Sequence, residues 1–183
     1  MQFDTYFGLG ARGGRTLPEL EFRAIRPDDR ERVAFMYDRL SSESRRRRFF
    51  TAKPALTQRE LTFLTVVDHV RHVAVAAVDR RDGSIVGTAR YVQEPGRPGV
   101  ADVAVEVIDE LQNRGIGTAL ATVLLEQARA NGFRMLTATT LWENRPARAL
   151  LRRFRFNPRA GRGAEIDLEL ELVSALGPSP SAS

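Results

Sequence analysis

The segment "QNRGIG", residues 112–117, places two glycines at the point where an expected strand leads into an expected helix. The N–H groups of the first helical turn have no internal partner and carry a partial positive charge, so they bind anions such as phosphate. Gly115 and Gly117 would let an anion approach without meeting a Cβ atom. The alternative is a tight turn in which the glycines only relieve backbone strain. Because glycine inside a helix costs about 1 kcal/mol relative to alanine, we favour anion binding.

A second glycine motif, "GLGARG" at residues 8–13, matches the dinucleotide pattern GxGxxG. That pattern binds a dinucleotide only when a strand precedes it and a helix follows. Here the following "GRTLPELEF" contains a proline and has no helical periodicity. We therefore assign this motif to a flexible tail. Neither glycine segment contains GK[ST], which disfavours nucleotide hydrolysis.

Periodicity predicts the elements that position the anion-binding segment. We expect strands at residues 21–25, 73–78, 84–92, 100–108, 134–141 and 165–173, and helices at 28–40, from Thr57, at 115–130 and from Asn144. On the 115–130 helix the inward face carries Ile116, Leu120, Val123 and Leu124. The order β, α, α, β, β, β, α, β, α, β indicates an α+β (mixed α/β) domain with helices on the faces of one sheet.

Composition limits the class of protein. The 183 residues suit one domain, which we expect at 19–174 between flexible tails at 1–18 and 175–183. The absence of cysteine excludes disulfides, thiolate metal sites and a cysteine nucleophile. No apolar run approaches the roughly 20 residues that span a membrane, and the N-terminal residues lack the apolar core of a signal peptide. We expect a cytoplasmic protein without membrane contact.

The net charge of +5 favours an acidic partner, which leaves nucleic acid, a phosphate-bearing cofactor or an acidic protein. The run "SRRRR" has no aromatic stacking pattern beside it, so nucleic acid is disfavoured, and we interpret the run as a solvated helix face or a docking patch. His69 and His72 lack a third ligand nearby, so we expect no metal. The sequence does not determine the oligomeric state, and a homodimer is possible.

Several motifs together resemble the GNAT family of N-acetyltransferases. "QNRGIG", preceded by "VEV" and followed by "TALATVLLEQA", is similar to the acetyl-CoA signature Q/R-x-x-G-x-G/A of that family. "TTLWENRPARALLRRFRF" resembles the block in which an asparagine opens a helix, and the order of elements agrees from residue 21 to 173. "LSSESRRRRFF", residues 40–50, resembles a segment of bacterial protein-lysine acetyltransferases.

The resemblance implies a central, mostly antiparallel mixed sheet that splays open beside the strand before the signature, with acetyl-CoA as cosubstrate and no metal. By position, three residues of that strand would bond the pantetheine arm and the acetyl group, and the signature would cradle the pyrophosphate. Asn144 would contact the cofactor from the other side, although an N-cap role explains it nearly as well. The implied cofactor-binding residues are Val105, Glu106, Val107, Asn113, Arg114, Gly115, Ile116, Gly117, Thr118 and Asn144.

The chemistry implied by the resemblance needs a base, because a free lysine with a pKa of about 10.4 is almost entirely protonated at pH 7. Alternation along the 100–108 strand puts Asp102 and Glu106 on one face. Asp102 stands where the similar lysine acetyltransferases have a glutamate base, whereas Glu106 is nearer the expected acetyl group. We expect one of the two carboxylates to be the catalytic base; an exposed sheet face without catalytic function is the alternative.

Two positions depart from the family pattern. Leu151 stands where many members have a tyrosine that protonates the departing thiolate, so no general acid is assigned. Arg155 replaces the usual glycine before Phe156, which leaves the end of this helix open to change. Water can reprotonate a thiolate, since thiols with pKa values near 8.5 are fair leaving groups.

We therefore expect an N-acetyltransferase that moves an acetyl group directly from acetyl-CoA to an amine, with a protein lysine as the first choice of acceptor. The alternatives are a small-molecule amine such as a polyamine or an aminoglycoside-like compound, and an acyl-CoA-binding regulatory module without catalysis.

Overall fold

One mixed sheet organises the molecule in the computed structural model, which describes residues 5–7 and 19–172. Its strand order is β1-β2-β3-β4-β5-β6-β8-β7, and only β5 and β6 pair in parallel. The strands are β1 (Thr5–Phe7), β2 (Leu20–Ala24), β3 (His72–Asp79), β4 (Ile85–Gln93), β5 (Val100–Val107), β6 (Met135–Leu141), β7 (Asn157–Arg162) and β8 (Glu165–Glu171). The expected mixed, mostly antiparallel sheet is confirmed.

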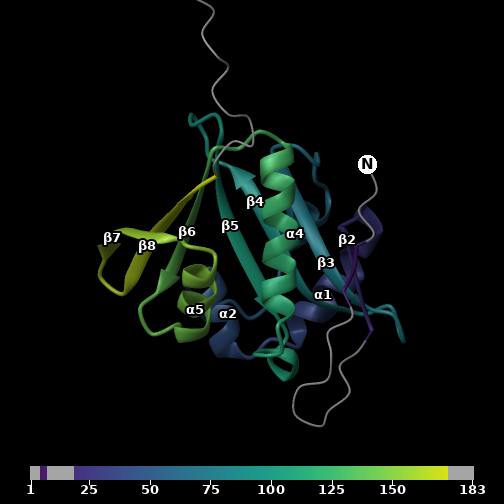
Figure 1. Cartoon of the computed structure of the whole chain (residues 1–183). Coiled ribbons are helices and arrows are strands. Elements are labelled where there is room, and N and C mark those ends of the chain that lie inside the picture. Colours follow the sequence, from purple (N-terminus) through teal and green to yellow (C-terminus); the bar gives the residue numbers. More distant parts are fainter. Residues whose placement is uncertain (1–4, 8–18, 173–183) are drawn as a thin grey trace, which may run out of the picture.

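Helices cover both faces of this sheet (Figure 1). In that view α4 and α5 lie in front of the sheet, and α1 and α2 lie behind it. The helices are α1 (Arg30–Asp38), α2 (Ser42–Phe49), α3 (Gln58–Thr65), α4 (Ile116–Ala130) and α5 (Arg145–Arg153), with short 3-10 turns η1 (Pro27–Asp29) and η2 (Asp109–Leu111).

The sheet splays open between β5 and β6. These strands pair only where residues 100–102 face residues 135–137, whereas β4 pairs with β5 from Ala101 to Val107. Residues 103–107 therefore have a strand partner on the β4 side and none on the β6 side. An unpaired strand edge offers backbone hydrogen-bonding groups to a ligand, because buried backbone groups need partners.

The core lies mainly between α4 and strands β3, β4 and β5. The four side chains predicted to face inward from α4, from Ile116 to Leu124, are all buried. Close packing at Gly87 of β4 fixes this contact, since a Cβ there would lie 2.8 Å from the Glu106 carbonyl oxygen and 3.2 Å from Leu120. The alternation predicted for β8 is also confirmed, with Ile166, Leu168 and Leu170 buried.

Three elements lie outside the sequence expectation. Thr5–Phe7 forms β1 and pairs with β2, so this part of the predicted N-terminal tail is a strand; the remaining tail positions lie outside the described residues. Strand β7 carries no buried residue, and α2 has none either. Without a buried apolar face, neither element has the periodicity by which helices and strands are identified in a sequence.

Arg155 adopts a backbone conformation that favours glycine, with φ of 63° just after α5. The helix end is nonetheless regular, because the Arg155 N–H donates to Arg152 O at 2.9 Å and the Phe156 N–H donates to Leu151 O at 3.0 Å. The arginine therefore does not alter the helix end but holds it in a strained conformation. Strain of this kind costs about 1 to 3 kcal/mol in general.

We expect Arg155→Gly to stabilise the protein by about 1 kcal/mol, because relief of the strain exceeds the entropy that glycine adds to the unfolded chain. Thermal unfolding should show a midpoint about 2 to 4 °C higher. Arg152→Gly, inside the same helix, is the matched control and should lower the midpoint. A lower midpoint for Arg155→Gly would contradict this account.

Candidate active site

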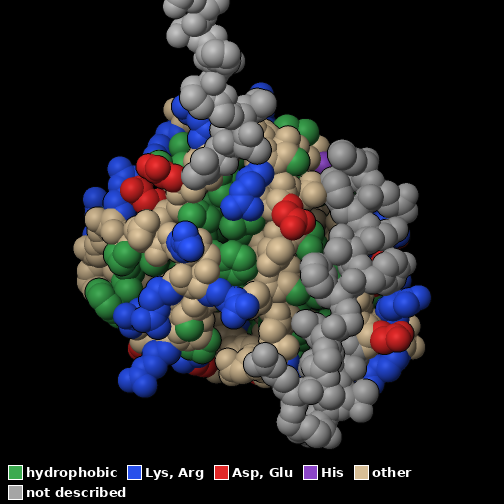
Figure 2. Space-filling view, viewed as in Figure 1, with side chains coloured by type: hydrophobic (Ala, Val, Ile, Leu, Met, Phe, Trp, Pro, Cys, Tyr) green, Lys and Arg blue, Asp and Glu red, His purple; other side chains and the backbone are tan. Residues whose placement is uncertain are grey.

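A cleft of about 790 Å³ occupies the opening between β5 and β6. Its walls come from β5, β6, α2, the first turn of α4, and α5. Val103, Val105 and Val107 provide apolar lining along β5. On the face drawn in Figure 2, hydrophobic side chains are visible in the middle and Lys and Arg side chains surround them. Such a cleft suits an elongated ligand with an apolar arm and anionic groups.

The first turn of α4 forms one end of the cleft and offers unpaired N–H groups. The first helical hydrogen bond runs from the Ala119 N–H to Gly115 O at 3.0 Å, and no side chain caps the helix. The N–H groups of Ile116, Gly117 and Thr118 therefore have no acceptor within the helix. The turn before them has positive φ at Asn113 (59°) and Gly115 (89°).

The signature residues are not equivalent in this turn. Asn113, Gly115, Gly117 and Thr118 line the cleft, whereas Arg114 does not and the Ile116 side chain is buried in the core. The cofactor-binding roles predicted for Arg114 and Ile116 stay predictions, and for Ile116 only the backbone N–H is available to a ligand.

Different structural features explain the glycines at positions 115 and 117. Gly115 has φ of 89°, so backbone strain alone explains it, which is the alternative considered for the motif. Gly117 has no such constraint, and a Cβ there would lie 3.8 Å from both Val105 and Leu150. Its missing side chain leaves space inside the cleft rather than relieving the fold. Gly117 is therefore the residue at which cofactor approach can be tested without disturbing the turn.

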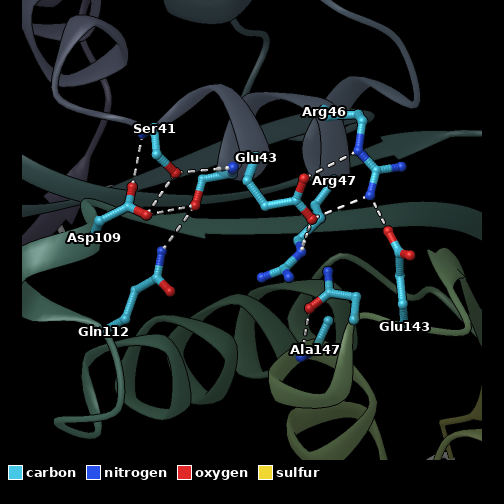
Figure 3. A network of polar contacts seen from close by, with 10 residues as sticks. Ser41, Glu43, Arg46, Arg47, Asp109, Gln112, Glu143 and Ala147 are labelled. Carbon is cyan, nitrogen blue, oxygen red and sulfur yellow. Dashed lines mark hydrogen bonds and ion pairs between the residues drawn. The ribbon is translucent and has the colours of Figure 1, made fainter.

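Helix α2 is fixed to both walls of the cleft by polar contacts (Figure 3). Towards the signature, the Asp109 carboxylate accepts hydrogen bonds from the hydroxyls of Ser41 and Ser44, and Gln112 Nε2 donates to Ser44 Oγ at 3.3 Å and to Val107 O at 3.0 Å. Towards α5, Arg46 pairs with Glu143. The motif's first residue thus joins β5 to α2, a contact that the sequence does not reveal.

Asp102 lies where β5 and β6 separate, in register with Thr137 of β6. The residue is exposed to the cleft, although the protein groups around its carboxyl displace part of the water that would solvate the charged form. The pKa of Asp102 is raised to about 6: burial is the largest cause, the nearby carboxylates of Glu94 and Asp167 add to it, and the Arg48 guanidinium acts in the opposite direction. A carboxyl group that titrates near neutral pH is suited to exchange protons with a substrate.

Glu106 has different surroundings on the same face of β5. Its Oε1 accepts a hydrogen bond from Thr88 Oγ1 at 2.8 Å, and its Oε2 lies 3.4 Å from Arg48 Nε. Arg90 of β4 is buried in the same region, and burial lowers its pKa to about 10 while the charge of Glu106 raises it. Glu106 is therefore held among two cations and a hydroxyl group. Neither Arg48 nor Arg90 was singled out from the sequence, because their contacts depend on register and on the position of α2.

Helix α5 forms the wall of the cleft on the β6 side. Asn144 caps this helix through its Oδ1, which accepts a hydrogen bond from the Ala147 N–H at 3.2 Å, and the residue also lines the cleft. The N-cap explanation is thus confirmed, and cofactor contact stays a prediction. Leu151 lines the cleft as well, and no tyrosine is among the described residues that do so.

The described ranges contain no group of three or more His, Cys, Asp or Glu side chains that could hold a metal ion. A search of the same ranges finds no helix with the length and apolar character needed to cross a membrane.

The splayed sheet, the open helix N-terminus and the carboxylates between them define an N-acyltransferase that uses an acyl-CoA donor. The chain belongs to the acetyltransferase (GNAT) family, whose model matches residues 28–156. This family uses acetyl-CoA, and the unpaired N–H groups of α4 and the valine-lined cleft fit its pyrophosphate and pantetheine parts. The chain thus carries a GNAT acetyltransferase domain.

Two curated relatives of this chain are both named acetyltransferases. The chain is 31% identical over 131 residues to acetyltransferase Pat of Mycolicibacterium smegmatis, covering 72% of this chain and 39% of that protein. It is 34% identical over 136 residues to acetyltransferase PA5475 of Pseudomonas aeruginosa, covering 70% and 69%. The chain therefore spans well under half the length of the first relative.

Among solved structures, the GNAT domain of S. lividans PAT superposes with a TM-score of 0.78 at 28% identity, covering 84% of this chain and 90% of that domain. The expected fold and family are confirmed by these matches.

Proposed function

We propose that this protein acetylates lysine side chains of proteins, and that Asp102 is the general base. The observation that carries the proposal is the position of Asp102 in the cleft, at the point where β5 and β6 separate. The pantetheine arm would run from the α4 N-terminus along β5 towards this point. The reacting amine would then meet the thioester beside Asp102.

Each step of the reaction has a group of this chain to support it. When bound, acetyl-CoA supplies the activated acetyl group. Asp102, with its pKa raised to about 6 by burial, takes the proton from the amine directly or through water. A backbone N–H on the unpaired edge of β5, beside the thioester, donates to the thioester oxygen as it gains charge. The departing thiolate is reprotonated by water, since Leu151 has no proton to give.

The choice of a protein acceptor has two supports. The segment that resembles protein-lysine acetyltransferases forms α2, whose Arg47 and Arg48 line the acceptor side of the cleft. The curated relative Pat and the S. lividans PAT domain are similar to this chain in sequence and, for PAT, in structure. A lysine side chain is long enough to place its amine inside a cleft while the peptide stays outside.

A small cationic amine is the second candidate. Glu94 and Asp167 act on Asp102 from the β4–β5 connection and from β8, and together the three carboxylates would attract a polyamine. The third candidate, a regulatory module that binds acyl-CoA without turnover, is motivated by Leu151.

Thermal unfolding with acetyl-CoA, CoA, NAD or ATP, followed by assays of CoA release, separates these candidates. A ligand at about 100 times its Kd adds about 2.7 kcal/mol, which should raise the midpoint by about 5 to 10 °C for acetyl-CoA and not for NAD or ATP. Faster CoA release with lysine peptides than with spermidine would support the protein acceptor. The reverse order would favour the small amine, and binding without release for any amine would favour the regulatory module.

A further inference from the structure

We propose that Arg48 is a specificity-determining residue that places a fixed positive charge in the acceptor half of the cleft and thereby selects amines without a second cation nearby. The inference rests on the proposed function, because it concerns the acceptor of that reaction. It assigns a role to a residue within the arginine run that the sequence indicates only as a helix face or docking patch.

The position of Arg48 is defined by two contacts. Its Nε lies 3.4 Å from Glu106 Oε2, and its guanidinium lies over the Phe49 ring at 5.0 Å from the centroid. Its side chain is 21% exposed and that of Glu106 is 8% exposed, and both residues line the cleft. The guanidinium is therefore part of the cleft wall and not a solvated surface charge.

The contact with Glu106 is an ion pair without a hydrogen bond. Among the described residues, neither Arg48 Nε nor Glu106 Oε2 has a hydrogen-bond partner, although both atoms are buried. A buried oxygen and a buried N–H without hydrogen-bond partners are unfavourable, and the mutual attraction of the two charges at 3.4 Å offsets part of this cost. A second cation entering here would compete with Arg48 for Glu106, whereas a carboxylate beside the reacting amine would gain a partner.

Arg48 also acts on the proposed base. The charged groups that act on Asp102 are Arg48 from α2, Glu94 from the β4–β5 connection and Asp167 from β8. The hydroxyl of Thr137, in register with Asp102 on β6, donates to Glu94 Oε1 at 2.6 Å. Arg48 is the cation in this set and lowers the pKa of Asp102, against burial and both carboxylates. Removing its charge should therefore make Asp102 harder to ionise.

A purely structural role is the competing explanation, because α2 has no buried residue and depends on polar contacts. Arg46 provides the matched control. It lies on the same helix and carries the same charge, but it pairs with Glu43 and Glu143 and does not line the cleft. If Arg48 only held the helix in place, Arg46→Gln and Arg48→Gln should have similar effects.

The experiment compares two blocked peptides of equal length, in which the acceptor lysine is flanked by glutamate or by arginine, with butylamine and spermidine as the corresponding small amines. The wild type should prefer the glutamate-flanked peptide, or butylamine, by roughly tenfold in kcat/KM, because juxtaposed like charges are costly. Arg48→Gln should remove most of this preference through KM, and Arg48→Lys and Arg46→Gln should retain it.

A readout that needs no turnover accompanies the kinetics. The carboxyl ¹³C resonance of Asp102, assigned with Asp102→Asn, should titrate at higher pH in Arg48→Gln than in the wild type and in Arg46→Gln. An unchanged titration, or an unchanged preference, would overturn the inference, as would equal effects in Arg46→Gln. If no amine is acetylated, the proposed function fails, and the titration alone decides whether Arg48 acts on Asp102.

Discussion

Asp102→Asn is expected to lower kcat by about 10²- to 10⁴-fold, which is the usual contribution of a general base. The substitution keeps the size of the side chain and removes its ability to take a proton from the amine. Affinity for acetyl-CoA should change little, because the residue lies beyond the cradle at the α4 N-terminus. Steady-state CoA release gives kcat, and thermal unfolding titrations give cofactor affinity.

Glu106→Gln is the matched control, since it neutralises the other carboxylate on the same face of β5. Its effect on kcat should be smaller than that of Asp102→Asn, because Glu106 is already paired with Arg48 and Thr88. A larger loss of kcat in Glu106→Gln would reverse the assignment of the base.

The pH profile provides a second test of the same assignment. A base must be unprotonated to act, and the pKa of Asp102 is raised to about 6. The wild-type kcat/KM should therefore fall on the acid side of about pH 6, by about tenfold per pH unit, and level off above it. The residual activity of Asp102→Asn should lack this limb. An acid limb that persists unchanged in the variant would exclude Asp102 as its source.

Gly117 substitutions are expected to separate stability from cofactor binding. Gly117→Ala should stabilise the free protein by about 1 kcal/mol, because alanine is the better helix former. The same methyl group would occupy the space between Val105 and Leu150 that the cofactor needs, so the stabilisation by acetyl-CoA should decrease. Gly117→Glu adds a negative charge beside the expected pyrophosphate and should weaken binding by at least about 100-fold. Thermal unfolding with and without acetyl-CoA measures both effects.

Gln127→Glu is the control for charge, because it adds one carboxylate to α4 far from its N-terminus. It should leave the acetyl-CoA shift unchanged. If the Gly117→Glu variant is folded and binds acetyl-CoA as tightly as the wild type, the α4 N-terminus is not the anion site. The glycines of "QNRGIG" would then serve only to form a tight turn.

Local patterns in the sequence were sufficient for most elements of the fold. The strands β3, β4, β5 and β8 follow from apolar runs or alternation, and the capping box of Thr57 and Glu60 marks the start of α3. The turn before α4 follows from its glycines. These features depend on neighbours in the chain, because helix caps, turns and faces are set over a few residues. The same local reasoning missed β7 and gave no bounds for α2, because neither element buries an apolar face.

The site required more than local pattern. The sequence determined that Asp102 and Glu106 share a face of β5, since alternation fixes the direction of each side chain. It left open which of them is suited to act as a base. The difference comes from Thr88, Arg48, Glu94 and Asp167, which reach β5 from four other segments of the chain.

The tertiary structure alone decided where the sheet opens, where α2 lies, and which charges surround each carboxylate. Strand register and helix position depend on packing between segments far apart in sequence, and no spacing of residues within one segment encodes them. Electrostatic effects on a side chain depend on distance and burial, so they appear only once those segments are assembled. The sequence by itself indicated the class of chemistry, and the assembled sheet set the surroundings on which the proposal of Asp102 as the base rests.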